Sequence, residues 1–139
     1  MRQVLTVLGL VAAWMWGAAA VQAADMLVLD CKTTSTVVNA ALQPRMVLSY
    51  DRAKNTLLVA DGLIFSVNGD KPLAGRVVSE NDTRIDFSWQ VKNVRNVTGQ
   101  ISTLNFKIVY MKATSKYTVQ MIPQGYDNIF RDQGVCTVE

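Results

Sequence analysis

The chain has 139 residues, a formal charge of +3, 50% hydrophobic residues and 18% charged residues. This composition suits one globular domain and excludes a disordered or collagen-like chain. The chain contains no histidine, which excludes Ser-His-Asp and Cys-His catalysis and removes the commonest side-chain ligand of transition metals. The basic residues are scattered among acidic ones, so we expect no nucleic-acid partner.

The first 23 residues have the pattern of a cleavable export signal. Arg2 precedes an uncharged run from Val4 to Val21, and the segment Val21-Gln22-Ala23 approximates the small-x-small pattern of signal peptidase sites. We therefore predict cleavage after Ala23, a single β-domain over residues 24–139, and a periplasmic or secreted location without a stable membrane anchor. The alternative is an uncleaved anchor, because about 18 uncharged residues are just enough to cross a bilayer.

Short segments with alternating polarity make up the rest of the chain. In Thr83–Val91 apolar and polar residues alternate, and this period of two predicts a strand with one buried face. Asp86 falls on the polar face of that strand, where we expect it to meet water. Turn-forming sequences such as Asp51–Asn55 and Asn68–Pro72 separate the segments. The expected strands are Met26–Cys31, Arg45–Tyr50, Thr56–Ala60, Leu63–Val67, Leu73–Ser79, Thr83–Val91, Leu104–Met111, Tyr117–Ile122 and Gly134–Val138.

Two further segments have a weaker pattern. Thr36–Leu42 predicts one helical turn or a loop, and Tyr126–Arg131 predicts a short helix before the last strand. Strands at short intervals with turn-length gaps are typical of antiparallel architectures. We predict an all-β fold, either an antiparallel β-sandwich or a small closed β-barrel of about eight strands.

The two cysteines lie near opposite ends of the predicted domain. An exported protein meets an oxidising compartment, where we expect Cys31 and Cys136 to form a disulfide. Closing a loop of about 100 residues stabilises a fold by about 4–5 kcal/mol in the chain-entropy model. There is no Cys-x-x-Cys pair and no third cysteine, so we expect neither a redox site nor a metal site, and no cofactor.

Several short motifs together resemble a group of small exported proteobacterial proteins. Members of this group pair an early cysteine with a Gly-x-Cys motif close to the C-terminus. The resemblance implies a periplasmic β-fold, and it assigns no catalytic or binding residue because the group is largely uncharacterised. The motifs that carry it are Tyr50-Asp51, the strand around Trp89, Val97-Thr98-Gly99-Gln100, Gly125-Tyr126-Asp127-Asn128, Phe130-Arg131 and Gly134-Val135-Cys136.

The sequence offers two sets of candidate binding residues. Phe87, Trp89, Phe106 and Tyr110 share the apolar faces of two strands, where they line a cavity if the barrel is hollow and otherwise form a packed core. The second set is a candidate recognition loop, because tyrosine and arginine are favoured at binding hot spots. Its alternative role is to close the end of the fold with Tyr126 and Phe130. The loop consists of Tyr126, Asp127, Asn128, Phe130 and Arg131.

No catalytic motif accompanies these residues. Most carboxylates fall in predicted turns, where they cap the backbone, and neither a Ser-x-x-Lys nor a Gly-x-Ser-x-Gly motif occurs. We therefore expect a non-enzymatic binding or interaction module, such as an inhibitor or accessory factor of an envelope protein. The alternative is a carrier of a small apolar ligand in an internal barrel cavity.

Overall fold

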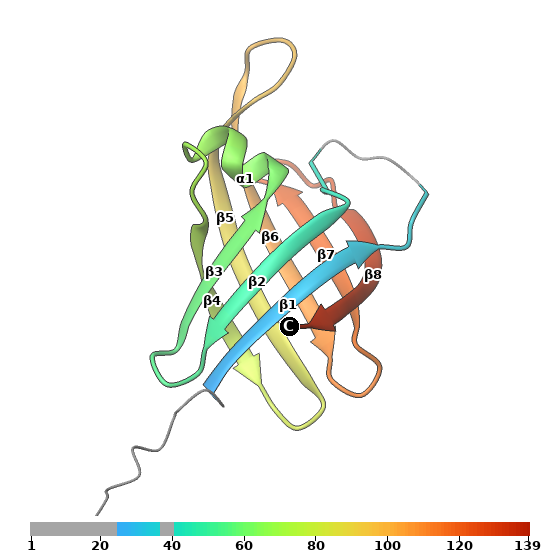
Figure 1. The fold of residues 1–139 in the computed structure, drawn as a ribbon. Coiled ribbons are helices and arrows are strands. Elements are labelled where there is room, and N and C mark those ends of the chain that lie inside the picture. Colours follow the sequence, from blue (N-terminus) through green and yellow to red (C-terminus); the bar gives the residue numbers. More distant parts are fainter. Residues whose placement is uncertain (1–24, 37–40) are drawn as a thin grey trace, which may run out of the picture.

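The chain folds into a closed antiparallel barrel whose eight strands follow one another in sequence order (Figure 1). This computed structural model describes residues 25–36 and 41–139, so the predicted signal segment 1–23 and residues 37–40 lie outside it. The prediction of an all-β fold is confirmed, and the closed barrel is the correct one of the two predicted architectures. The strands are β1 Met26–Thr33, β2 Arg45–Asp51, β3 Thr56–Asp61, β4 Leu73–Glu80, β5 Arg84–Arg95, β6 Ile101–Met111, β7 Lys116–Pro123 and β8 Phe130–Val138.

The barrel interior is packed by side chains from alternate positions of the strands. In β5 the residues Ile85, Phe87, Trp89 and Val91 are all buried, as the alternation predicts. The same period of two runs through β6 and β7. The other buried hydrophobic residues are Leu29, Cys31, Leu42, Met46, Leu48, Tyr50, Leu57, Val59, Ile64, Leu104, Phe106, Ile108, Tyr110, Tyr117, Val119, Met121 and Cys136.

The first and last strands close the barrel and carry the disulfide. Cys31 of β1 lies directly opposite Cys136 of β8 in the antiparallel register, and the two sulfur atoms are bonded. Both residues are buried. The predicted disulfide is therefore confirmed, and such a bond is compatible with an oxidising compartment outside the cytosol.

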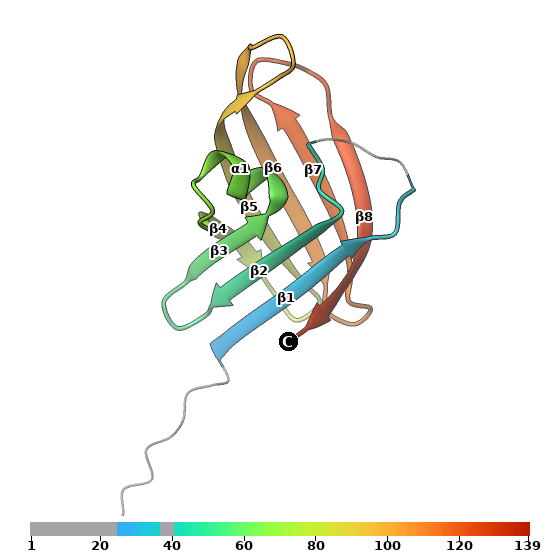
Figure 2. The same ribbon diagram turned by 45° about the horizontal axis from the view of Figure 1, so that its top comes forward.

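The expected strand Leu63–Val67 is wrong, because this segment forms the short helix α1, Gly62–Val67. A carboxylate oxygen of Asp61 accepts a hydrogen bond of 2.8 Å from the backbone N–H of Ile64, which starts the helix as an N-cap. Ile64 is the one helix residue that is buried. Residues 63–67 are apolar or small and do not alternate with a period of two. The N-cap hydrogen bond to Asp61 therefore selects a helix over a strand. Figure 2 shows the helix lying across one end of the barrel.

The expected helix over Tyr126–Arg131 is also wrong. Residues 126–129 form an irregular connection, and β8 begins at Phe130, four positions before the expected start at Gly134. Gly125 has a φ of 84°, and the N–H of Tyr126 donates to the carbonyl of Pro123 at 3.2 Å. This turn follows β7, and residues 126–129 then lead to β8 without forming a helix.

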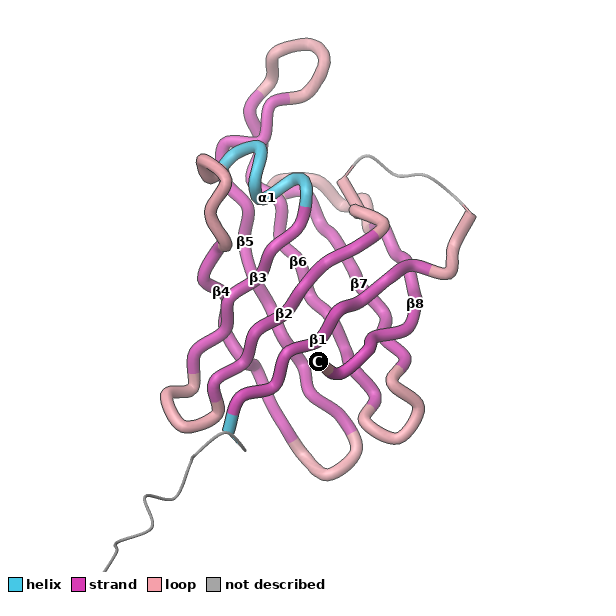
Figure 3. The backbone as a smooth tube through the Cα atoms, in the orientation of Figure 1, coloured by secondary structure: helices cyan, strands magenta, loops and turns pink. Residues whose placement is uncertain are grey.

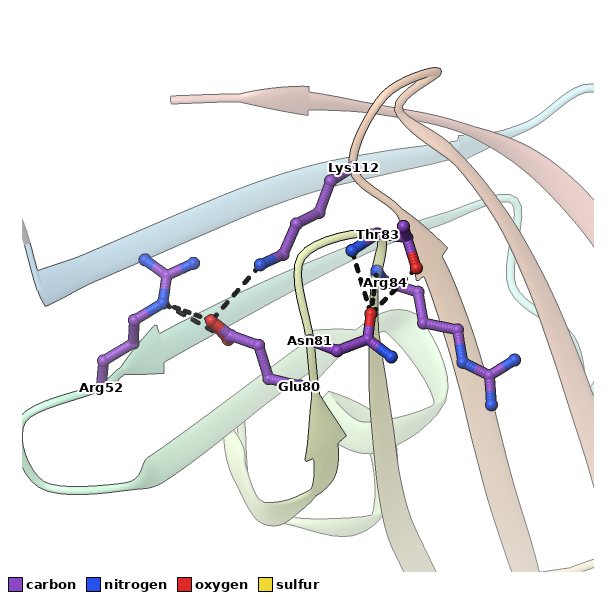
Figure 4. Close-up of polar contacts among 6 residues, drawn as sticks. All are labelled: Arg52, Glu80, Asn81, Thr83, Arg84 and Lys112. Carbon is purple, nitrogen blue, oxygen red and sulfur yellow. Dashed lines mark hydrogen bonds and ion pairs between the residues drawn. The ribbon is translucent and has the colours of Figure 1, made fainter.

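The two ends of the barrel carry different kinds of connection (Figure 3). The turn end carries the short links β2–β3, β4–β5 and β6–β7. The loop end carries the β1–β2 connection, α1 with its flanking residues, the β5–β6 hairpin and the β7–β8 connection. At the turn end, Glu80 contacts Arg52 at 2.8 Å and Lys112 at 3.6 Å, which joins all three links (Figure 4).

Candidate functional site

The β5–β6 hairpin extends beyond the rest of the barrel at the loop end (Figure 1). Its ladder is regular up to the pair Val91 and Leu104, and it resumes at Val94 and Ser102 with one extra residue in β5. Within this bulge, Asn93 adopts a left-handed φ of 60°. A bulge reverses the alternation that follows it. As a result Val94, rather than Asn93, packs against the apolar core.

A hollow of about 600 Å³ opens beside this hairpin, and we call it the mouth pocket. Its walls come from the β5–β6 hairpin and from the β7–β8 connection. Of the described residues, α1 and the β1–β2 connection each contribute one. The apolar lining consists of Ala41, Leu63, Val94, Val97, Leu104, Pro123, Tyr126 and Phe130, and the polar lining consists of Arg95, Asn96, Gln100, Ser102 and Asn128. The pocket is therefore largely apolar, with a polar rim.

A chain of hydrogen bonds joins the two long walls of the mouth pocket. The side-chain amide of Gln100 donates to the hydroxyl oxygen of Tyr126 at 2.9 Å. The amide nitrogen of Asn96 approaches the side-chain oxygen of Gln100 at 3.4 Å. The side-chain oxygen of Asn96 accepts from the backbone of Thr98 and Gln100 and from the Thr98 hydroxyl, which fixes the hairpin turn. The rim is thus an ordered structure.

The candidate recognition loop forms part of this pocket. Tyr126, Asn128 and Phe130 line it, and Tyr126 is 51% exposed. Asp127 and Arg131 do not belong to the lining, and Arg131 lies opposite Gln120 in the ladder between β7 and β8. The structure therefore brings three of the five loop residues together on one concave surface.

The four candidate cavity residues all lie in the barrel interior and belong to the hydrophobic core. The rings of Trp89 and Phe106 stack in parallel with centroids 5.3 Å apart. The ring of Phe87 packs edge-on against the ring of Tyr50, with centroids 5.8 Å apart. Tyr110 is 3% exposed. In this arrangement the aromatic rings pack against neighbouring rings. The indole N–H of Trp89 is buried and has no hydrogen-bond partner in the described structure.

The sequence predicts that Asp86 is exposed to water, and this prediction is wrong. Asp86 is 3% exposed, and one of its carboxylate oxygens lies 3.2 Å from the guanidinium of Arg84. Arg84 is two residues away on the same face of β5, so its long side chain covers the shorter carboxylate. The other carboxylate oxygen of Asp86 is buried and has no hydrogen-bond partner among the described residues.

Residues of the opposite pocket wall were not predicted from the sequence. Val94, Arg95 and Ser102 lie beyond the expected strand ends, and Leu63 lies in the segment Leu63–Val67 for which the sequence predicts a strand. Val97 is the one residue of this wall whose type could have pointed to a binding site, because a valine at the tip of a hairpin does not pack in a core. Val97 is fully exposed in the structure.

Other hollows of about 460–570 Å³ also occur in the described residues, and Trp89 and Phe106 line one of them. Within residues 25–36 and 41–139, no three His, Cys, Asp or Glu side chains gather closely enough to hold a metal ion. No helix in those ranges has the length and apolar character needed to cross a bilayer. Comparison with protein-family models, with curated proteins and with solved structures finds no match for the chain.

Proposed function

We propose that this protein is a non-enzymatic binding module of the periplasm or the extracellular medium, and that it binds a small apolar molecule in the mouth pocket. One observation carries the proposal, namely a largely apolar hollow of about 600 Å³ at the loop end. Small-molecule sites have volumes of about 300–1,000 Å³ and combine apolar walls with a few polar groups. The disulfide and the sequence without histidine support the exported location and the non-enzymatic role.

The mouth is a better place for the ligand than the barrel interior. Trp89 and Phe106 stack on each other inside, and each is at least 95% buried. An internal ligand would have to displace these rings from their packing, which costs free energy. The mouth pocket requires no such displacement, because Tyr126 and Val97 are already exposed at its rim.

Binding of N-phenyl-1-naphthylamine, a neutral apolar dye that fluoresces on leaving water, tests this function. We expect saturable binding to the disulfide-bonded protein. The variant Val94→Asp places a charge in the apolar wall, and we expect it to weaken binding by about tenfold or more. Val78→Asp is the matched control, because Val78 is 49% exposed on β4 and does not line the pocket.

A second variant protects the test against misfolding. Val97 is fully exposed at the pocket rim, so Val97→Asp leaves the core untouched and should also weaken dye binding. The absence of saturable binding to the wild-type protein overturns the proposal. An equal loss in Val78→Asp overturns it too, because the dye would then bind elsewhere.

A protein partner is the second candidate function, as expected for an inhibitor or accessory factor of an envelope protein. It is favoured by exposed apolar residues around the mouth, since such patches mark interaction sites. Ile101 and Ile129 are 55% and 45% exposed, and neither lines the pocket. The variant Ile129→Asp separates the two functions, because it weakens a partner that covers the rim and leaves a small ligand in the pocket unaffected.

A further inference from the structure

We propose that the ligand of the mouth pocket is an apolar monoanion, such as a medium-chain carboxylate, and that Arg95 binds its acidic group. This inference rests on the proposed function and adds the chemical class of the ligand. Among the described residues, Arg95 is the one charged residue of the lining. A ligand with a single negative charge and an apolar body matches a lining of this composition.

Most N–H donors of the Arg95 guanidinium are not used in hydrogen bonds within the described structure. The guanidinium makes one hydrogen bond, of 3.3 Å, from Nη1 to the carbonyl of Gly99, and no carboxylate of the described residues forms an ion pair with it. An arginine side chain has five N–H donors in a planar fork that matches the two oxygens of a carboxylate. Arg95 can therefore bind an acidic group without giving up an existing ion pair.

The hydrogen bonds of the rim run in one direction and end in a donor. Asn96 donates to Gln100, and Gln100 donates to the hydroxyl oxygen of Tyr126. The oxygen of Asn96 is already occupied by three donors of the hairpin turn. The acceptors of this chain are consequently used internally, while the hydroxyl proton of Tyr126 remains for a ligand. Together with the positive charge of Arg95, this hydroxyl donor favours an anion.

The apolar walls account for the rest of the ligand. Leu63, Val94, Leu104 and Phe130 lie in or against the hydrophobic core of the barrel. Burying an apolar chain against them removes its surface from water, which favours binding. The acidic group then stays at the rim with Arg95, where it keeps part of its hydration.

Two dyes that differ only in one anionic group test the assignment. 8-Anilino-1-naphthalenesulfonate is N-phenyl-1-naphthylamine with an added sulfonate. We expect the wild-type protein to bind the sulfonate about tenfold more tightly than the neutral dye. Arg95→Gln should abolish this preference by weakening binding of the sulfonate about tenfold more than it weakens binding of the neutral dye. Sodium chloride at about 0.5 M should weaken binding of the sulfonate alone.

Arg131→Gln is the matched control, because it removes the same charge from the same loop end outside the pocket lining. An equal effect in Arg131→Gln and Arg95→Gln overturns the role of Arg95. Binding of the neutral dye without any preference for the sulfonate overturns the anion and leaves the proposed function intact, whereas binding of neither dye overturns both. Decanoate should displace the neutral dye at a concentration about tenfold lower than decanol does, and equal displacement contradicts the inference.

Discussion

The turn end and the loop end of this barrel use their residues for different purposes. At the turn end, Glu80 holds Arg52 and Lys112, and the side-chain oxygen of Asn81 accepts from the backbone of Thr83 and Arg84 (Figure 4). These contacts join short links to one another and leave their polar groups paired. Connections at the loop end instead surround a largely apolar hollow. Under the proposed function, the turn end secures the fold and the loop end binds the ligand.

Exposed apolar residues occur at both ends of the barrel, since Met26, Met111 and Val138 near the turn end are 48%, 39% and 55% exposed. At the loop end, Phe65 of α1 is 38% exposed, Val97 is fully exposed, and Ile129 is 45% exposed. Exposing such residues contributes nothing to folding, because the hydrophobic effect stabilises only what is removed from water. Loops on a rigid scaffold are also where binding residues concentrate. A chain that keeps these residues in its loops is consistent with a binding role at that end.

Loss of the disulfide should have the largest effect and should act on both ends alike. Cys136→Ser removes a link between residues 105 positions apart. We expect the free energy of unfolding to fall by about 4–5 kcal/mol, because the unfolded chain regains its loop entropy. Guanidinium titration measures this loss. The wild-type protein under reducing conditions is the control and should lose the same amount, and free thiols in unreduced, unfolded protein would contradict the prediction.

The next largest effect should come from adding a side chain at Gly134, where β8 pairs with β1. A Cβ atom here would collide with the backbone carbonyl of Lys32 and would lie 2.7 Å from the ring of Tyr117. Gly134→Ala should therefore destabilise the fold by about 1–3 kcal/mol. Gly99→Ala at the tip of the β5–β6 hairpin is the comparison. Nothing lies within 4 Å of a Cβ there, and a φ of 84° is the only obstacle.

Thermal denaturation of both glycine variants measures the contrast. We expect Gly99→Ala to cost about 1 kcal/mol, which is the cost of a left-handed conformation for a residue with a side chain. A larger loss in Gly99→Ala than in Gly134→Ala would mean that the hairpin is integral to the barrel's stability. The division between the two ends would then be wrong.

The same division explains which features the sequence could predict. Strand β5 was predictable over Thr83–Val91, because alternation continues as long as the strand has one buried face. Its last residues were not, because the bulge before Val94 breaks the period of two. Leu63–Val67 was ambiguous for a similar reason. A short apolar run fits either a strand or a buried helix, and the cap from Asp61 becomes evident only in three dimensions.

The mouth pocket was predictable in part. Tyr126 and Phe130 attract attention by residue type alone, since aromatic side chains in a loop have no strand pattern to explain them. The opposite wall depends on tertiary structure. Arg95 and Leu63 are 32 positions apart in sequence, and only barrel closure and the bulge bring them to the same hollow.

At the turn end, removal of the Glu80 charge should have a modest effect. Glu80→Gln weakens the contacts with Arg52 and Lys112, whose side chains are about one third exposed. We expect the free energy of unfolding to fall by about 0.5–1 kcal/mol in dilute buffer and the loss to shrink in concentrated salt. Urea titration at two salt concentrations measures it. Asp82→Asn changes the charge of the same turn without touching these pairs, and a similar loss there would show a general charge effect.

At the loop end, the smallest expected effect is a change in how the free energy of unfolding depends on pH, caused by Asp61. Burial raises the pKa of Asp61 above its ordinary value of 3.8, although its carboxylate caps α1. A raised pKa means that the folded state binds the proton more tightly than the unfolded chain does. The stability that this group contributes is therefore fully present below pH 3.8 and is lost as the pH rises through the raised pKa.

Asp61→Asn removes this titration and keeps a side-chain oxygen for the N–H of Ile64. We expect the stability of the variant relative to wild type to improve between pH 3 and pH 7, as measured by urea titration at each pH. Asp61→Ala is the control, because it loses the cap and should cost about 1 kcal/mol at neutral pH. Parallel pH profiles for the wild type and Asp61→Asn would mean that the carboxylate ionises as freely in the fold as in the unfolded chain. In that case α1 would pack too loosely over the barrel to exclude water from Asp61, and the part of the pocket lining that α1 supplies through Leu63 would be loose as well.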